Sequence, residues 1–150
     1  MTGTDSTGSR QSTTAHKFFL TIDGKSFDFF TRCTGLGLSV DLDEFDDGGF
    51  NESPIHLPKS IRYSNIVLAR PVTQLTMDTC QWVQRAATNS ERTTGQIRCL
   101  GSNDVEVAKW DLLNVMPVAW RGPVLDAEST HVPMEEIELA HEGFFPPDMT

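Results

Sequence analysis

The fold is decided by the segment WDLLNVMPVAWRGP at residues 110–123, together with IELAHEGF at residues 137–144. Apolar and polar side chains alternate along both segments, which is the period-two pattern of β-strands with one buried face. Nothing in either segment has the pattern of a catalytic or metal site. The sequence here therefore predicts a β-protein that packs and assembles rather than one that makes or breaks bonds.

The same alternation extends toward the N-terminus. Residues 18–22 form a predicted strand that ends at the Asp23-Gly24 turn, and residues 27–30 form a second, shorter strand. After a bend at residues 34–37, residues 38–43 alternate strictly between aliphatic side chains and hydroxyl or carboxylate side chains. This last pattern predicts a half-buried strand with an acidic outer face.

The rest of the chain predicts further strands and one helix. Apolar residues recur at helical spacing after Leu75, so we predict a helix over residues 77–88 that is capped by Thr76 or Asp78. The other predicted strands cover residues 61–70, 97–100, 105–113, 115–120 and 134–144. The expected fold is mainly β: a small β-barrel or two packed antiparallel sheets, with about seven or eight strands, one flanking α-helix and a long extended loop.

The length and the net charge of the chain predict a single acidic domain. With 150 residues, the chain is expected to fold as one domain over residues 16–150, preceded by a flexible polar segment at residues 1–15. Its 21 acidic and 12 basic residues give a net charge of −9, which argues against sequence-specific nucleic-acid binding but suits the non-sticky wall of a conduit. The sequence lacks the run of roughly 20 apolar residues that a membrane span needs. It also lacks an apolar signal segment, so synthesis in the cytoplasm is expected.

No cofactor or metal is expected. The three cysteines, Cys33, Cys80 and Cys99, have no CxxC or other metal-binding spacing, and we interpret them as reduced, small buried residues. An EF-hand frame over the acidic residues 41–47 fails because an aromatic residue takes a ligand position in both possible frames. Gly35-Leu36-Gly37 lacks the third glycine of a dinucleotide fingerprint, so it is interpreted as a turn.

Catalysis is not expected either. His141, which lies near two glutamates, is the most suggestive of the four histidines, but the chain has no GxSxG nucleophile motif. Glu136 and Glu138 have the residue types of an acid–base pair. Because neighbouring residues on a strand point to opposite faces, they are better explained as the polar face of a strand whose other face carries Ile137 and Leu139. We therefore interpret the chain as non-enzymatic.

One predicted loop differs from the others. Residues 46–58 are long for a connection within a compact domain, and such loops are usually functional or mobile. The loop carries Phe50, Ile55 and Leu57, which are apolar side chains that a solvated loop would disfavour. We expect this loop either to contact a partner or to pack as a flap on its own domain.

A series of short blocks along residues 18–144 carries a family resemblance. The blocks are Gly35-Leu36, Gly48-Gly49, Leu57-Pro58, Tyr63-Ser64-Asn65-Ile66, Leu68-Ala69-Arg70 with Thr73, Trp82, Trp110, Asn114-x-x-Pro117, Trp120-x-Gly122-Pro123 and Glu138-Leu139-Ala140-His141-Glu142-Gly143. In this order and spacing, they resemble the tail-tube proteins of contractile phages and of phage-derived contractile injection systems. Three departures are local: Pro71 stands where the family usually has a glycine, Met116 stands where an aromatic residue is common, and the residues that flank Gly48-Gly49 also differ.

The resemblance implies a structural role. Proteins of this family fold as a small β-barrel of two packed sheets with one flanking helix. Six copies form a ring, and rings stack into a hollow tube inside a contractile sheath. With the loop at residues 46–58 reaching onto a neighbouring subunit or the next ring, the expected assembly residues are Phe50, Ile55 and Leu57, followed by Asp46, Glu52, His16 and Lys17.

The expected partners follow from the same resemblance. They are further copies of the chain, a contractile sheath protein, baseplate or spike and tube-terminating proteins, and a cargo or tape-measure protein in the lumen. The assembled particle is expected in the bacterial cytoplasm or released from the cell. Alternatives within the class are a baseplate protein that initiates the tube and, more distantly, the type VI secretion tube.

An alternative from another class is a monomeric β-barrel that binds a small ligand in its interior. Such a site needs a cavity with a few convergent polar groups. The predicted strands at residues 38–42 and 108–112 would instead fill a barrel interior with bulky apolar side chains. The sequence therefore favours the structural tube protomer.

Overall fold

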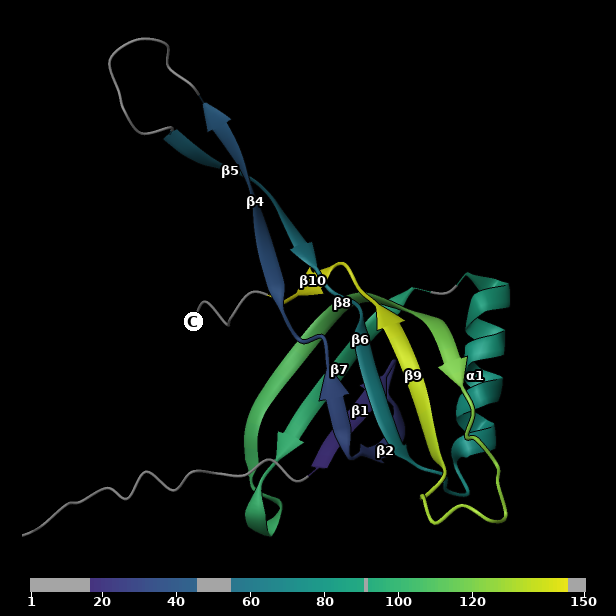
Figure 1. The fold of residues 1–150 in the computed structure, drawn as a ribbon. Coiled ribbons are helices and arrows are strands. Elements are labelled where there is room, and N and C mark those ends of the chain that lie inside the picture. Colours follow the sequence, from purple (N-terminus) through teal and green to yellow (C-terminus); the bar gives the residue numbers. More distant parts are fainter. Residues whose placement is uncertain (1–16, 46–54, 91, 146–150) are drawn as a thin grey trace, which may run out of the picture.

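The computed structural model describes residues 17–45, 55–90 and 92–145, which form ten strands, one α-helix and one short 3-10 helix (Figure 1). The helices are α1 (Thr76–Asn89) and η1 (Ser102–Asp104). The strands are β1 (Lys17–Ile22), β2 (Lys25–Phe30), β3 (Arg32–Thr34), β4 (Leu38–Phe45), β5 (Ile55–Tyr63), β6 (Ile66–Pro71), β7 (Thr93–Leu100), β8 (Glu106–Arg121), β9 (Met134–Ala140) and β10 (Gly143–Phe144).

Most of the strands build two antiparallel sheets that share β8. One sheet has the order β2-β1-β7-β8, with β10 also paired to β8, and the other has the order β8-β9-β6-β3. The chain also passes from one sheet to the other at Thr31, whose backbone N–H donates to the carbonyl oxygen of Ala69 (2.9 Å). In the described part of the chain, the path of paired strands is not closed into a barrel. Of the two expected arrangements, the structure therefore has the two packed sheets.

The sequence of β8 explains how one strand serves both sheets. Asn114 has a φ of 49°, in the left-handed region that asparagine tolerates better than most residues. At this point the pairing with β7 shifts register between Gly95↔Leu112 and Thr93↔Val115. Leu112 and Val115 are both fully buried although they lie three residues apart. The bulge at Asn114 therefore shifts the alternation of β8 by one residue, so that Leu112 before it and Val115 after it both face the core.

The core lies between the two sheets and confirms the predicted alternation on β9. Ile137 and Leu139 are fully buried, whereas Glu136 and Glu138 on the other face remain partly exposed. Full burial of an aliphatic or aromatic side chain contributes about 1.5–3 kcal/mol relative to leaving it in water. The core consists of Leu20, Ile22, Phe27, Phe30, Ile66, Leu68, Ile97, Leu112, Val115, Ile137 and Leu139.

The helix α1 flanks the sheets along one side of the body, as predicted (Figure 1). Trp82 packs edge-on against Phe27, with 4.8 Å between the ring centroids. The predicted cap is wrong, because the N-cap residue is Leu75, which makes no side-chain capping hydrogen bond. The Oγ1 of Thr76 instead accepts a hydrogen bond from the backbone N–H of Thr73 (3.0 Å). The hydroxyl therefore stabilises the turn before the helix rather than the helix N-terminus.

The prediction of one strand over residues 61–70 is wrong. β5 ends at Tyr63 and β6 begins at Ile66, and at this break the chain enters the second sheet. The alternating pattern continues across the break, so it does not reveal the change of sheet. The opposite error occurs at residues 115–120, which continue β8 instead of forming a separate strand.

The prediction of a loop over residues 46–58 is wrong at its C-terminal end. β5 already begins at Ile55 and runs through Pro58, where its pairing with β4 shifts register. Proline is tolerated in edge strands and at bulges, where its missing N–H is not needed for a ladder hydrogen bond. Within the described residues β5 pairs on one side only, which explains why a proline did not end the strand.

One ion pair is buried in the core. Arg70 and Glu135 face each other on β6 and β9, with 2.8 Å between Nε and Oε1. The guanidinium also donates to the carbonyl oxygen of Phe27 and to Thr79 Oγ1 (2.9 Å), and it lies 4.4 Å from the ring centroid of Phe30. A buried charge needs such close partners to offset the loss of its hydration. The pair therefore links β2, β6, β9 and α1.

Candidate assembly interface

The strands β4 and β5 form a hairpin that projects away from the two sheets (Figure 1). Its register runs from Leu38↔Tyr63 at the base to Phe45↔Ile55. Neither strand pairs with any other strand in the ranges that the structure describes. An isolated two-stranded hairpin is at best marginally stable in water. The stability of this element therefore depends on what covers it.

One face of the hairpin is apolar and exposed. Leu38, Val40 and Leu42 follow one another along β4, and Ile61 lies opposite Val40 on β5. Their exposed fractions are 53%, 45%, 53% and 55%, respectively. We call these four residues the apolar hairpin face. The prediction that residues 38–42 are half-buried and fill the interior is wrong, because the strand lies outside the core.

The opposite side of the hairpin is charged. Arg62 pairs with the carboxylate of Asp41, which also accepts a hydrogen bond from Ser60 Oγ (3.1 Å). Lys59 Nζ lies 3.8 Å from Asp43 Oδ1. Exposed ion pairs of this kind contribute at most about 1 kcal/mol. The hairpin therefore has one side suited to water and one side suited to another apolar surface.

Three aromatic rings hold the base of the hairpin. Tyr63, the last residue of β5, lies 5.4 Å from His141 and 5.3 Å from Phe144, measured between ring centroids. His141 Nδ1 accepts a hydrogen bond from the backbone N–H of Gly143 (3.2 Å), which leaves Nε2 to donate to the carbonyl oxygen of Ser64 (3.1 Å). The turn between β9 and β10 therefore fixes the direction in which the hairpin leaves the body.

A close backbone contact also fixes the base. Gly35, which precedes β4, has a φ of +89°, and a Cβ atom there would lie 2.0 Å from the carbonyl oxygen of Asn65. Only glycine combines this conformation with this approach. The chain segments that enter and leave the hairpin are therefore in direct contact. The bend predicted at residues 34–37 is shorter in the structure, because Thr34 still belongs to β3 and only residues 35–37 connect β3 to β4.

A charged cluster on β8 and β9 neighbours the base. Arg121 donates to Glu138 (2.8 Å) and lies 3.5 Å from Glu136, and Asn65 Nδ2 donates to Glu138 (3.0 Å). The hydrogen bonds from Arg121 and then Asn65 lower the pKa of Glu138, and the bond to Glu138 raises the pKa of Arg121. A carboxylate held in its ionised form is a poor general acid. The cluster is therefore better suited to a structural role.

The described residues contain no group of three His, Cys, Asp or Glu side chains that could hold a metal ion. The cysteines are free thiols: Cys99 is buried, whereas Cys33 and Cys80 are half-buried. Burial raises the pKa of Cys33 to about 12 and also raises the pKa of Cys99. These two thiols are therefore un-ionised at neutral pH and weakly nucleophilic. Across the described ranges, no helix has the length and apolar character to span a bilayer.

The predicted assembly residues lie only partly within the described chain. Ile55 begins β5 opposite Phe45, and Leu57 follows with an exposed side chain. Lys17 begins β1 in the body, where its Nζ lies 3.7 Å from Asp104 Oδ1, so it does not join the hairpin. Outside the described residues lie His16, Asp46, Phe50 and Glu52.

The apolar hairpin face is not among the assembly residues that the sequence predicts. The alternation of residues 38–43 predicts burial within the same chain. A period-two pattern shows that one side of a strand is shielded from water, but not which chain shields it. The available signal was a second alternating segment at residues 55–63, which together with residues 38–43 would have indicated a hairpin.

The fold and the hairpin define a class. A body of two packed antiparallel sheets that projects an amphipathic hairpin with an uncovered apolar face has the features of a protein that associates with other chains. The chain belongs to the family of the T4-like virus tail tube protein gp19, whose model matches residues 14–145. The expected family is thereby confirmed, and the chain is a structural tube protomer.

Solved structures of injection-system proteins share the fold. A chain in the PVC sheath–tube complex of an extracellular contractile injection system, in the extended state, is similar with a TM-score of 0.76 and 21% identity over 97% of both chains. A chain in the tube-terminating cap of the anti-feeding prophage has a TM-score of 0.75 and 21% identity over 89% of both chains. Hcp1 from Flavobacterium johnsoniae has a TM-score of 0.51 and 19% identity over 87% of this chain and 99% of that chain. Among curated proteins, no sequence matches this chain with significance.

Proposed function

We propose that this chain forms hexameric rings that stack into the hollow inner tube of a contractile injection system or phage tail, and that contraction of a surrounding sheath drives the tube outward. The observation that carries the proposal is the apolar hairpin face, which leaves four large aliphatic side chains in water. Membership of the tail-tube family and the likeness to a chain of a sheath–tube complex support the tube and the sheath.

In this proposal the hairpin joins one subunit to the next. Its apolar face gains about 25 cal/mol for each Å² of apolar surface that a neighbour removes from water. Its charged side stays hydrated. Ile55 and Leu57 continue the hairpin toward its tip, and Asp46, Phe50 and Glu52 lie between β4 and β5 in the sequence. We include these five residues in the contact, with His16 and Lys17 as a second, separate contact.

The remaining parts of the proposal concern the partners. Tubes begin on a baseplate or spike, end at a terminating protein and carry a cargo or tape-measure protein in the lumen. The net charge of −9 keeps polyanions from adhering to the wall, so sequence-specific nucleic-acid binding is not part of the function. The particle assembles in the bacterial cytoplasm or is released, and the tube itself catalyses no reaction.

Negative-stain electron microscopy of the purified, concentrated protein tests the proposal. We expect the wild-type chain to form hollow tubes of stacked rings. The double variant Leu38→Ser/Ile61→Ser should stay folded by circular dichroism but require at least about tenfold more protein to assemble, since about 1.4 kcal/mol of lost contact energy corresponds to a factor of ten. The control Ser39→Ala changes the charged side of the hairpin and should form tubes like the wild type.

Two other outcomes would contradict the tube. Wild-type protein that forms single rings without stacking would indicate a baseplate protein that initiates the tube. Wild-type protein that stays monomeric at all concentrations would favour a small-ligand-binding β-protein.

A further inference from the structure

A second exposed apolar surface lies on the loop that connects β8 to β9 (residues 122–133). Val124, Leu125 and Val132 on this loop are 87%, 81% and 64% exposed, respectively. Single exposed aliphatic residues are common on protein surfaces. Three on one ordered loop form a patch of the kind that marks interaction sites.

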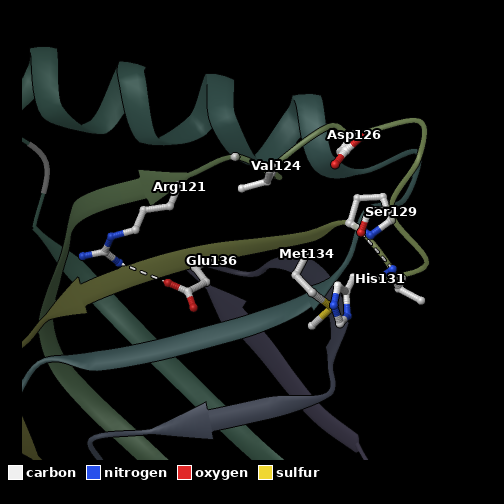
Figure 2. Close-up of a pocket in the computed structure, with 10 residues that line it drawn as sticks. Arg121, Val124, Asp126, Ser129, His131, Met134 and Glu136 are labelled. Atoms are coloured by element: carbon white, nitrogen blue, oxygen red, sulfur yellow. Dashed lines mark hydrogen bonds and ion pairs between the residues drawn. The ribbon is translucent and has the colours of Figure 1, made fainter.

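The patch borders a hollow of about 440 Å³ (Figure 2). Val124, Val132 and Met134 contribute its apolar lining, and Figure 2 shows Arg121 and Glu136 paired at one side of it. Most of the lining residues belong to the loop, and the ends of β8 and β9 contribute Arg121, Met134 and Glu136. The hollow is open to solvent and large enough to accept several side chains of another surface.

Loop 122–133 and the hairpin lie at opposite ends of the body (Figure 1). β9 begins at Met134, which lines the hollow, and ends at Ala140, next to the ring of His141 that packs against the hairpin base. A strand of this length spans roughly 20 Å at about 3.3 Å per residue. Since the hairpin points away from the body, it does not cover the hollow of its own subunit.

We propose that the hollow on loop 122–133 receives the apolar hairpin face of a second copy of this chain in the adjacent ring. This contact joins two different surfaces at opposite ends of the subunit. After two subunits associate, one hairpin and one hollow remain free, so further rings can add in the same way. Stacking of rings requires a contact of this type. The inference rests on the proposed function and specifies the receiving surface, which the hairpin alone does not identify.

The charges around the two surfaces are complementary. On the charged side of the hairpin, Arg62 is 74% exposed and its partner Asp41 only 35%, so the cation is outermost. The loop and the strand that follows it carry the carboxylates of Asp126, Glu128 and Glu136. Copies that each have a net charge of −9 repel one another at long range. The outward guanidinium of Arg62 attracts these carboxylates while it stays hydrated, which offsets part of that repulsion and favours this orientation of the contact.

A complementation experiment tests the pairing of the two surfaces. One variant, Ile61→Asp, alters only the hairpin, and the other, Val124→Asp/Leu125→Asp, alters only the loop. Neither should form tubes alone. An equimolar mixture combines an intact hairpin from one variant with an intact hollow from the other, so sedimentation should show assemblies of twice the mass and no longer polymers. The control Leu125→Met keeps the patch apolar and should form tubes like the wild type.

Disulfide cross-linking gives a second measurement that does not depend on loss of assembly. In the double variant Ile61→Cys/Val132→Cys, oxidation of concentrated protein should produce a ladder of covalent dimers, trimers and longer species on a non-reducing gel. Each single-cysteine variant carries only one half of the contact and should give no ladder. This comparison also accounts for the native cysteines, which are present in all three proteins.

The possible outcomes separate the inference from the proposed function. Tubes of wild-type length from the loop variant, or the absence of a cross-linked ladder from tubes, would overturn the inference and leave the tube intact. Loop-variant tubes that assemble normally but no longer bind sheath protein would assign the patch to the sheath and also overturn it. Wild-type protein that never assembles would contradict the proposed function itself.

Discussion

The body and the hairpin use the same alternating pattern in opposite ways. On β9, Ile137 and Leu139 are buried in the chain's own core. On β4, Leu38, Val40 and Leu42 have the same two-residue spacing but face solvent. The difference shows that a period-two pattern indicates which side of a strand is shielded from water. The pattern does not indicate whether the shielding surface belongs to the same chain or to another copy.

The ion pairs differ between the two regions in the same way. The body buries Arg70 against Glu135, whereas the hairpin places Arg62 and Asp41 at its surface. Removing one partner of a buried pair typically costs about 3–5 kcal/mol because the other charge is left uncompensated, whereas an exposed pair contributes at most about 1 kcal/mol. The comparison between the two regions can therefore be tested by matched substitutions.

The largest effect is expected for Glu135→Ala. It leaves the buried guanidinium of Arg70 without its carboxylate and should lower the free energy of unfolding by about 3–5 kcal/mol. Urea denaturation of the protein at low concentration measures this. The matched change Asp41→Ala on the hairpin should cost less than about 1 kcal/mol. Similar losses for the two variants would contradict the distinction between body and hairpin.

A pair of leucine truncations should separate stability from assembly. Leu68→Ala in the core should cost about 2–5 kcal/mol of unfolding free energy. Leu42→Ala on the apolar hairpin face should change the stability of the monomer by less than about 0.5 kcal/mol. It should nevertheless raise the concentration needed for tube formation, measured by light scattering. If Leu42→Ala destabilises the monomer as much as Leu68→Ala, the hairpin face is covered within the subunit.

A smaller and local effect is expected at the hairpin base. His141→Ala removes two hydrogen bonds, each worth about 0.5–1.5 kcal/mol, and one ring of the aromatic cluster. Amide hydrogen exchange of β4 and β5 should accelerate, while exchange in β7 and β8 stays unchanged. His56→Ala, on the hairpin itself but away from its base, is the control and should leave the exchange pattern as in the wild type.

The smallest effect is expected from pH. Because the folded state lowers the pKa of Glu138, its hydrogen bonds with Arg121 and Asn65 stabilise the fold above the ordinary glutamate pKa of 4.5. That contribution is lost as the pH falls below 4.5 through the lowered value. In Glu138→Gln, the free energy of unfolding should fall slightly less between neutral and acidic pH than in the wild type. Urea midpoints between about pH 3 and pH 7 measure this. An unchanged slope in both Glu138→Gln and Arg121→Gln would show that the pair contributes nothing.

Local features of the fold could be predicted from the sequence. The Asp23-Gly24 turn has φ values of 49° and 76°, as a two-residue hairpin turn requires, and these residue types are the ones that adopt it readily. The helix α1 was located from its apolar spacing. In both cases the signal and the structure lie within a few neighbouring residues, so no distant contact was needed to interpret them.

Features that depend on distant residues or on other chains could not be predicted. The partner of Arg70 lies 65 positions away, and no local pattern indicates that two charged residues meet inside the core. The bulge at Asn114 determines which side chains of β8 face the core, and it is defined only by the register in which β8 pairs with β7. The exposure of Leu38 and Ile61 depends on which copy of the chain covers them, and that information is absent from the local sequence.

The way the hairpin joins the body also determines how the protein bears force. β3 leads into the hairpin and β6 leads out of it, and these two strands are neighbours in the second sheet. Tension on the hairpin therefore runs along β6, whose hydrogen bonds to β9 are perpendicular to the strands. Such a load shears the ladder from Ile66↔Leu139 to Pro71↔Met134 together instead of unzipping it one bond at a time. Near the far end of this ladder lies the Arg70–Glu135 pair, so a pull at the hairpin is also resisted by this buried ion pair.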